Sequence, residues 1–217
     1  MKTKIRDRLG WRSAAATAIF LSLAVTIGQG VIASLNATVS NVSAQNIASG
    51  TMKLDMADAG NGFSTSISNL APGDVVNRYV TLTNSGSLDG IGLSLKTAQT
   101  GTASLITDGA GAVTTRALKL SVTACDVPWN TTLGTCSGTS SAEIPATVIG
   151  SLTSATSFLN GGMNSGGVKY LQMKLELPNQ NETTVNGTTP ANTVQGGSVN
   201  ITYTFDLAQR VGTKTNS

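Results

Sequence analysis

The sequence predicts an all-β fold, a two-sheet antiparallel sandwich of jelly-roll type preceded by a signal-peptide helix. Several runs alternate apolar and polar residues, the period of a strand with one dry face. Charged residues are only 12% of the 217 residues, and Gly occurs 24 times, a composition that suits sheets and turns better than helices. Seven to nine such strands bury their dry faces best as two packed sheets, which we expect over residues 49–210.

The most regular alternating run lies near the C-terminus. It begins after the break at Gly196-Gly197, and its apolar members are Val199, Ile201, Tyr203, Phe205 and Leu207. Polar or small residues stand between them. Because the apolar residues recur at every second position, a helix would scatter their side chains around its circumference. The sequence therefore predicts a strand here with one buried face.

Other runs of the same kind supply its neighbours. They cover residues 52–56, 76–82, 91–95, 118–124 and 168–177. The runs 76–82 and 91–95 are expected to be adjacent antiparallel strands, and Pro72-Gly73 marks a turn before the first of them. A helix is the alternative for 146–159, but its β-branched residues and Gly150 favour strand and loop.

Residues 1–33 resemble a secretory signal peptide. A basic start precedes an apolar run from Ala14 to Val25, and small residues follow it up to Ala33. We expect cleavage between Ala33 and Ser34. The alternative is an uncleaved membrane anchor, because the run from Ala14 to Ala33 is about as long as a spanning helix requires.

Residues 34–48 follow as a short strand and linker. Leu35, Ala37 and Val39 alternate with polar residues at the start of the processed chain, with no turn signal close by. Two interpretations remain open. The segment either joins the sheet of its own domain or acts as a donor strand that pairs with a neighbouring molecule. At the other end, residues 211–217 form a polar tail.

The charge of the processed chain gives no sign of a nucleic-acid partner. Five of the 14 Lys and Arg and one of the 11 Asp and Glu precede Ser34, which leaves nine basic and ten acidic residues. A net charge near −1 provides no basic footprint. We expect a secreted protein of the extracellular matrix or cell surface, with a membrane contact only through an uncleaved signal segment.

The two cysteines, Cys125 and Cys136, flank a loop that contains Pro128 and Gly134. In an exported chain they are expected to form a local disulfide, worth roughly 2 to 3 kcal/mol through loop closure. The alternative is two unpaired thiols.

No histidine occurs in the chain, which removes the Ser-His-Asp and Cys-His arrangements and the histidine-based zinc motif. We therefore expect no catalytic residues, no cofactor and no metal site. Two alternatives stay open. Calcium could bind through Asp58, Asn61 and Asp89, and a Ser-Lys dyad is formally possible although no pair is singled out. Asp55 with Asp58 is expected to be a solvated surface pair.

Several blocks of the chain resemble the TasA/CalY/camelysin family of secreted bacterial proteins. These blocks are Gly50 to Leu54, Leu70 to Asp74, Val80 to Leu88, Leu175 to Pro178 and Asn192 to Gln209. The resemblance implies a jelly-roll subunit, exported with a dedicated signal peptidase from a Gram-positive bacterium. It also implies a homopolymer, in which the N-terminal strand of one subunit completes the sheet of the next. Some members carry a metalloprotease label, from which this sequence departs because it lacks histidine.

The expected function is therefore structural: a subunit that polymerises by donor-strand complementation into biofilm-matrix or cell-surface fibres. One alternative is a camelysin-like surface metallopeptidase. The other is a monomeric cell-wall-associated binding domain.

Overall fold

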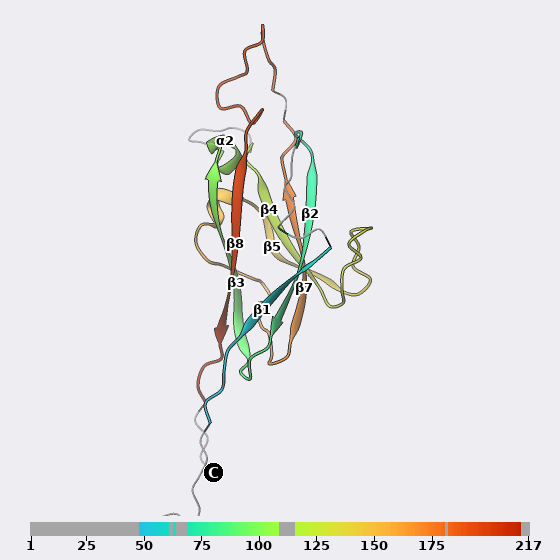
Figure 1. Cartoon of the computed structure of the whole chain (residues 1–217), viewed down its shortest axis with the longest axis vertical. Coiled ribbons are helices and arrows are strands. Elements are labelled where there is room, and N and C mark those ends of the chain that lie inside the picture. The colour runs from blue at the N-terminus through green and yellow to red at the C-terminus, as the bar shows by residue number, and fades with distance from the viewer. Residues whose placement is uncertain (1–47, 61–62, 64–68, 109–115, 181, 214–217) are drawn as a thin grey trace, which may run out of the picture. The chain divides into compact units, whose positions relative to one another are not determined.

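The structure, a computed structural model, describes residues 48–60, 63, 69–108, 116–180 and 182–213. The expected signal peptide, the cleavage site and the donor segment lie outside the described residues. From Ser49 onward the chain forms one unit, and its strands build two antiparallel sheets (Figure 1). The expectation of an all-β fold in two sheets is confirmed.

The larger sheet has five strands. In spatial order they are β1 (Leu54–Ala59), β2 (Val75–Asn84), β7 (Val168–Glu176), β4 (Lys119–Cys125) and β5 (Ser140–Val148). All of the neighbouring pairs are antiparallel. β1 and β5 are therefore the outer strands of this sheet.

The smaller sheet has three strands. In spatial order they are β6 (Thr156–Ser157), β3 (Gly90–Gly101) and β8 (Val199–Gln209). β8 pairs with β3 along nearly its whole length, from Val199 opposite Gly101 to Gln209 opposite Gly90. β8 is the run that alternates most regularly in the sequence, and it is confirmed as a strand.

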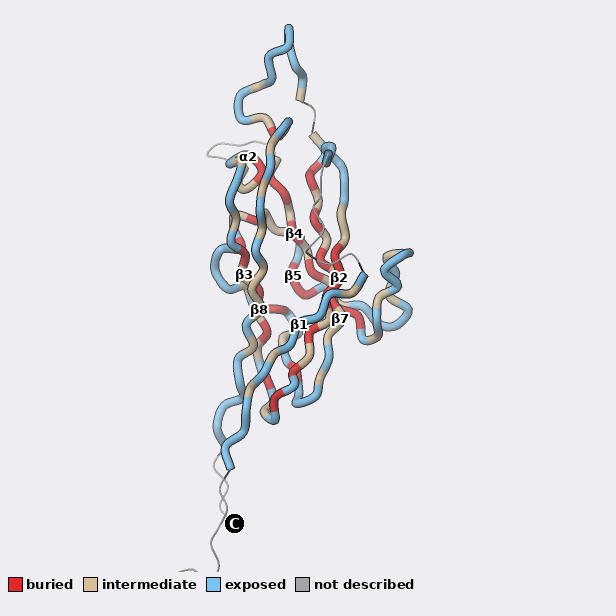
Figure 2. Tube along the Cα trace, in the orientation of Figure 1, coloured by how far each residue is buried: buried red, intermediate tan, exposed pale blue. Residues whose placement is uncertain are grey.

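The core lies between the two sheets, and Figure 2 shows its buried segments on the inner strands. The fully buried side chains with the largest volumes come mainly from β2, β3, β4 and β7. They include Leu82, Leu93, Leu95, Leu120, Leu171 and Met173. Because each alternates with residues that face outward, the period-2 pattern identified the inner face of these strands correctly.

The expectation that runs 76–82 and 91–95 are paired strands is wrong. β2 lies in the five-stranded sheet and β3 in the three-stranded sheet, so the two strands do not pair with each other. Asn84 explains the crossing: its side chain is 0% exposed, and its Nδ2 donates to the carbonyls of Leu88 and Met163 at 2.9 and 3.1 Å. These bonds hold the chain in a turn that passes from one sheet to the other.

Other element boundaries differ less. β1 covers Leu54–Ala59, later than the expected 52–56, and β3 covers Gly90–Gly101, longer than the expected 91–95. A short helix, α2 (Ala103–Ile106), follows it. Over 141–167, strand and loop are confirmed, with one 3-10 turn at Ile149–Leu152.

The predicted turn at Pro72-Gly73 is present before β2. Gly73 adopts a positive φ of 94°, and the amide of Asp74 donates to the carbonyl of Ala71 at 2.9 Å. A side chain at position 73 would strain this backbone, which is the reason that glycine is suited to it.

Candidate functional site

One side of the sandwich is closed by short connections. After β6, the amide of Leu159 donates to the carbonyl of Glu143 on β5, while the amide of Phe158 donates to the carbonyl of Leu93 on β3. The segment around Phe158 therefore joins the outer strand of one sheet to the other sheet. The opposite side, where β1 and β8 are the outer strands, is the candidate functional site.

β8 has a strand neighbour on one edge only within the described part of the chain. Its core-facing side chains are half-buried, whereas the β3 residues opposite them are fully buried. The pairs are Leu207 with Leu93, Phe205 with Leu95 and Tyr203 with Thr97. The inner face of β8 thus packs on the core but stays only half-buried.

Aromatic contacts hold the half-buried side chains of β8 in place. The Tyr203 ring lies 4.7 Å from that of Phe63, and the Phe205 ring lies 6.4 Å from that of Phe158, edge to face. Burial raises the pKa of the Tyr203 phenol, and the positive charge of Arg78 opposes that rise. The strand is therefore anchored on the sandwich, and no described strand pairs with its outer edge.

β1, the other strand at this side, is largely exposed. Four of its six residues are exposed, and Met56 shows 53% of its surface. An exposed sheet edge offers backbone donors and acceptors to an incoming strand, and natural proteins usually cover or charge such an edge. Among the described residues, β8 and β1 each pair with a strand on one edge only, so we call this side the open side.

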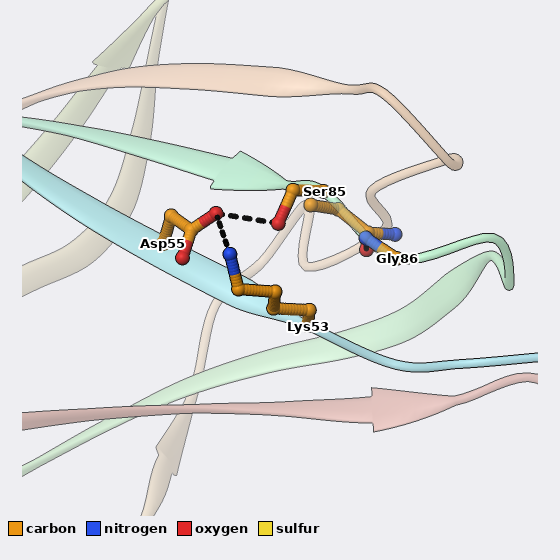
Figure 3. A network of polar contacts seen from close by, with 5 residues as sticks. Lys53, Asp55, Ser85 and Gly86 are labelled. Carbon is orange, nitrogen blue, oxygen red and sulfur yellow. Dashed lines mark hydrogen bonds and ion pairs between the residues drawn. The ribbon is translucent and has the colours of Figure 1, made fainter.

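A polar network fixes the beginning of β1 (Figure 3). Asp55 accepts hydrogen bonds from Ser85 Oγ and, at 3.0 Å, from Lys53 Nζ. The bonds from Ser85 and Lys53 lower the pKa of the Asp55 carboxyl. Asp55 and Asp58 are both exposed, as expected for a solvated surface pair. The bond from Ser85 was not expected, because Ser85 is 30 residues away in sequence. The network ties β1 to the turn after β2.

The backbone before β1 is held at the same turn. The amides of Ser87 and Leu88 donate to the carbonyl of Thr51, and the amide of Thr51 donates to Ser87 Oγ. β8 finishes at this same end of the unit, where the amide of Arg210 donates to the carbonyl of Asp89 at 2.9 Å. The chain that precedes Thr51 therefore enters the domain at the end where β8 stops.

The predicted disulfide between Cys125 and Cys136 is present, with the Cα atoms 5.9 Å apart. It joins the last residue of β4 to the loop that follows. The structure does not describe the three apolar residues of the expected donor strand, Leu35, Ala37 and Val39. The expected cleavage site, between Ala33 and Ser34, also lies outside the described residues.

The residues do not fit a zinc centre. In the part of the chain that the structure describes, the cluster of potential metal ligands is Cys125, Asp126 and Cys136. The two sulfurs are bonded to each other, so neither is available as a thiolate, and Asp126 Oδ1 accepts the amide of Thr139 at 2.8 Å.

The calcium hypothesis stays a hypothesis. Asp89 Oδ1 accepts the amide of Ser165 at 2.8 Å, and Asp58 is exposed on β1. Asn61 lies outside the described residues.

A Ser-Lys dyad gains no support from the arrangement around Asp55. Ser85 donates its hydroxyl to a carboxylate that Lys53 also contacts. In such a dyad the lysine amine accepts the serine proton, whereas here the Ser85 hydroxyl donates to Asp55. The network acts as a clasp for β1.

Over the described residues, no helix combines the length and the apolar character that crossing a bilayer would require.

Comparison with known proteins gives one family match. Residues 4–214 match the family model described as Camelysin metallo-endopeptidase. No individual curated protein matches the chain.

Proposed function

Since the chain belongs to the camelysin family, we propose that it is a secreted structural subunit that polymerises into extracellular fibres by donor-strand complementation. The match covers every block on which the resemblance to this family was based. The observation that carries the proposal is the open side of the sandwich, where the inner face of β8 is only half covered. The sandwich would then be of the jelly-roll type that the resemblance implies.

The proposed occupant of this open side is the segment 34–48 of a second copy. Its side chains Leu35, Ala37 and Val39 have the period of a strand with one apolar face, which matches the alternation along β8. Burying them would contribute roughly 3 to 5 kcal/mol at about 25 cal/mol per Å2, and ladder hydrogen bonds would add to this. A strand-length segment and an uncovered strand edge in one chain favour assembly between copies.

The described ends of the unit suggest the direction of the donated strand. The segment before Thr51 enters the domain at the end where β8 stops, near Arg210. In a chain of copies that all point the same way, a donor that leaves one copy at this end enters the next copy at the opposite end, near Val199. It would then run antiparallel to β8. Such head-to-tail addition does not close, so it produces filaments.

The proposed subunit is exported with the help of a signal peptidase that cuts between Ala33 and Ser34. The disulfide between Cys125 and Cys136 is consistent with an extracellular location, because such bonds persist in oxidising compartments. The proposed place of action is the matrix or the cell surface.

We further propose that this chain is not a metallo-endopeptidase, despite the description of the matching family. The sequence contains no histidine, and the thiols of Cys125 and Cys136 are consumed in a disulfide. Chelator-sensitive hydrolysis of casein by the purified protein would instead support the peptidase alternative.

Deletion of residues 34–43 from the secreted protein tests the structural proposal. We expect the variant to stay folded and monomeric, because the described sandwich begins at Ser49, and to form no filaments in negative-stain electron microscopy. Circular dichroism provides the control for folding. Filaments of normal length from the deleted protein would refute strand donation. A full-length secreted protein that stays monomeric at high concentration and binds wall fragments would favour the cell-wall domain.

A further inference from the structure

The loop closed by the disulfide lies on the outer face of the five-stranded sheet and reaches Gly60, just after the end of β1. Trp129 Nε1 donates to the carbonyl of Tyr170 on β7 at 3.0 Å, and its ring centre lies 5.9 Å from that of Tyr79 on β2. Gln172 Nε2 donates to the Tyr79 hydroxyl at 3.2 Å. Although it points away from the core, Tyr79 is only 4% exposed, because this loop covers it.

A pocket of about 490 Å3 lies between the loop, β2 and the end of β1. Its volume falls in the range of small-molecule sites, roughly 300 to 1,000 Å3. The lining residues are Gly60, Asn77, Tyr79, Thr131, Thr132, Leu133 and Gly134. Four of these come from the disulfide loop, so the loop forms a wall of the pocket.

The described lining residues are mostly polar, and none of them carries a charged side chain. Thr131 and Thr132 bring hydroxyls, and Asn77 brings an amide. Asn77 Oδ1 is buried and has no hydrogen-bond partner. A buried acceptor without a partner costs about 1 to 3 kcal/mol, which a ligand hydroxyl at this position would recover.

We propose that this pocket binds a neutral saccharide. Hydroxyl groups both donate and accept, so they match amide and hydroxyl groups on the wall. A charged ligand is disfavoured, because a wall without opposite charges would not compensate for its desolvation. The proposal does not depend on fibre assembly, since none of the described lining residues belongs to β8, the strand proposed to accept the donor.

Trp129 gives a direct readout of binding. The sequence has two tryptophans, Trp11 and Trp129, and Trp11 lies in the expected signal peptide. In the secreted protein the fluorescence therefore reports on the ring beside Tyr79. Titration with cellobiose, lactose and N,N′-diacetylchitobiose is expected to give a saturable change with at least one of them, whereas digalacturonic acid gives none.

Variants of the wall separate a specific site from a general effect. We expect Asn77→Ala to weaken binding about tenfold, the effect of losing one hydrogen bond to a buried acceptor. Thr132→Val, at an exposed position, supplies a second variant if Asn77→Ala fails to fold. The matched control is Asn179→Ala, an exposed asparagine outside the pocket, with unchanged affinity. No saturable response to any of the three neutral sugars, or equal affinity in Thr132→Val and wild type, would overturn the proposal.

Discussion

At the scale of single residues, Glu143 is the buried charge that secures the closed side of the sandwich. Its side chain is 0% exposed, and Lys169 Nζ lies 3.8 Å from Oε1. The amide of Asn160 donates to Oε2 at 2.7 Å, and Ser141 Oγ donates to Oε1 at 3.0 Å. One carboxylate thus connects β5, β7 and the segment after β6. Its hydrogen bonds offset the cost of burying a charge.

The first prediction concerns the loss of stability when this charge is removed. Glu143→Gln is expected to lower the free energy of unfolding by about 1 to 3 kcal/mol, because the neutral amide loses the ion pair with Lys169 and weakens the bond from Asn160. Chemical denaturation measures the change.

The matched control is Glu176→Gln. Glu176 pairs with Lys174 at 3.1 Å, but both side chains are more than a third exposed, so the expected change is below about 1 kcal/mol. Equal losses in the two variants would contradict the role given to Glu143.

The sequence could not single out Glu143. It stands in an irregular stretch, where the pairing of β4 with β5 shifts register between Val122 and Thr123. Its partners come from β7 and from the segment after β6, and no local pattern names them. The cysteine pair was predictable because its two members are close in sequence and flank a loop with turn residues. Local chemistry was visible in the sequence, whereas long-range polar contacts were not.

At the scale of elements, β1 depends on a few polar contacts more than on burial. Most of its side chains are exposed, and its attachment to the rest of the unit includes the clasp of Asp55, Ser85 and Lys53. The clasp stands next to the point where the chain enters the domain. Loosening it would release the beginning of β1 before the core is affected.

The lowered pKa of Asp55 makes this clasp dependent on pH. A folded-state pKa below the ordinary value of 3.8 means that the clasp contributes stability above that value and loses it as the pH falls through the folded pKa. Asp55→Asn is therefore expected to lower Tm at pH 7 and to match wild type in strong acid.

Thermal unfolding between pH 2 and pH 7 tests this pattern. Ser85→Ala removes the largest cause of the lowered pKa and should change Tm in the same direction at pH 7. If the difference in Tm between Asp55→Asn and wild type grew as the pH fell, the proposed role of the clasp would be ruled out.

The alternation of residues predicted strands and their inner faces, but it did not predict which strands are neighbours. β2 and β3 illustrate the limit. Both have clear period-2 patterns, and the short link between them suggested a hairpin. The link crosses between sheets because the buried side chain of Asn84 binds the carbonyls of Leu88, Met163 and Asn164. Two of these acceptors lie about 80 residues further along the chain, where no hairpin signal could reveal them.

At the scale of the whole molecule, the two sides of the sandwich differ in a way that gives assembly a direction. One side is closed by the segment around Phe158 and by Glu143, and the other presents β8 and β1 as outer strands. The proposed donor segment leaves its own domain at the end of the sandwich where β8 stops. A strand accepted along β8 would therefore be antiparallel to it, and each copy would extend the filament in the same direction.

This geometry predicts which positions of two copies come together. In an antiparallel arrangement the beginning of the donor segment lies beside the second half of β8. Asn36 faces outward on the expected donor, and Asp206 and Asn200 face outward in the second and first halves of β8. No free cysteine occurs among the described residues, so introduced thiols can be followed without interference.

The most direct test of strand donation is intermolecular disulfide trapping. Secreted Asn36→Cys protein is mixed with Asp206→Cys or Asn200→Cys protein, oxidised gently and separated on a non-reducing gel. The account predicts a covalent dimer with Asp206→Cys and little with Asn200→Cys. Trapping with Asn200→Cys alone would contradict the antiparallel direction, and no dimer with any outward position of β8 would contradict donation to this strand.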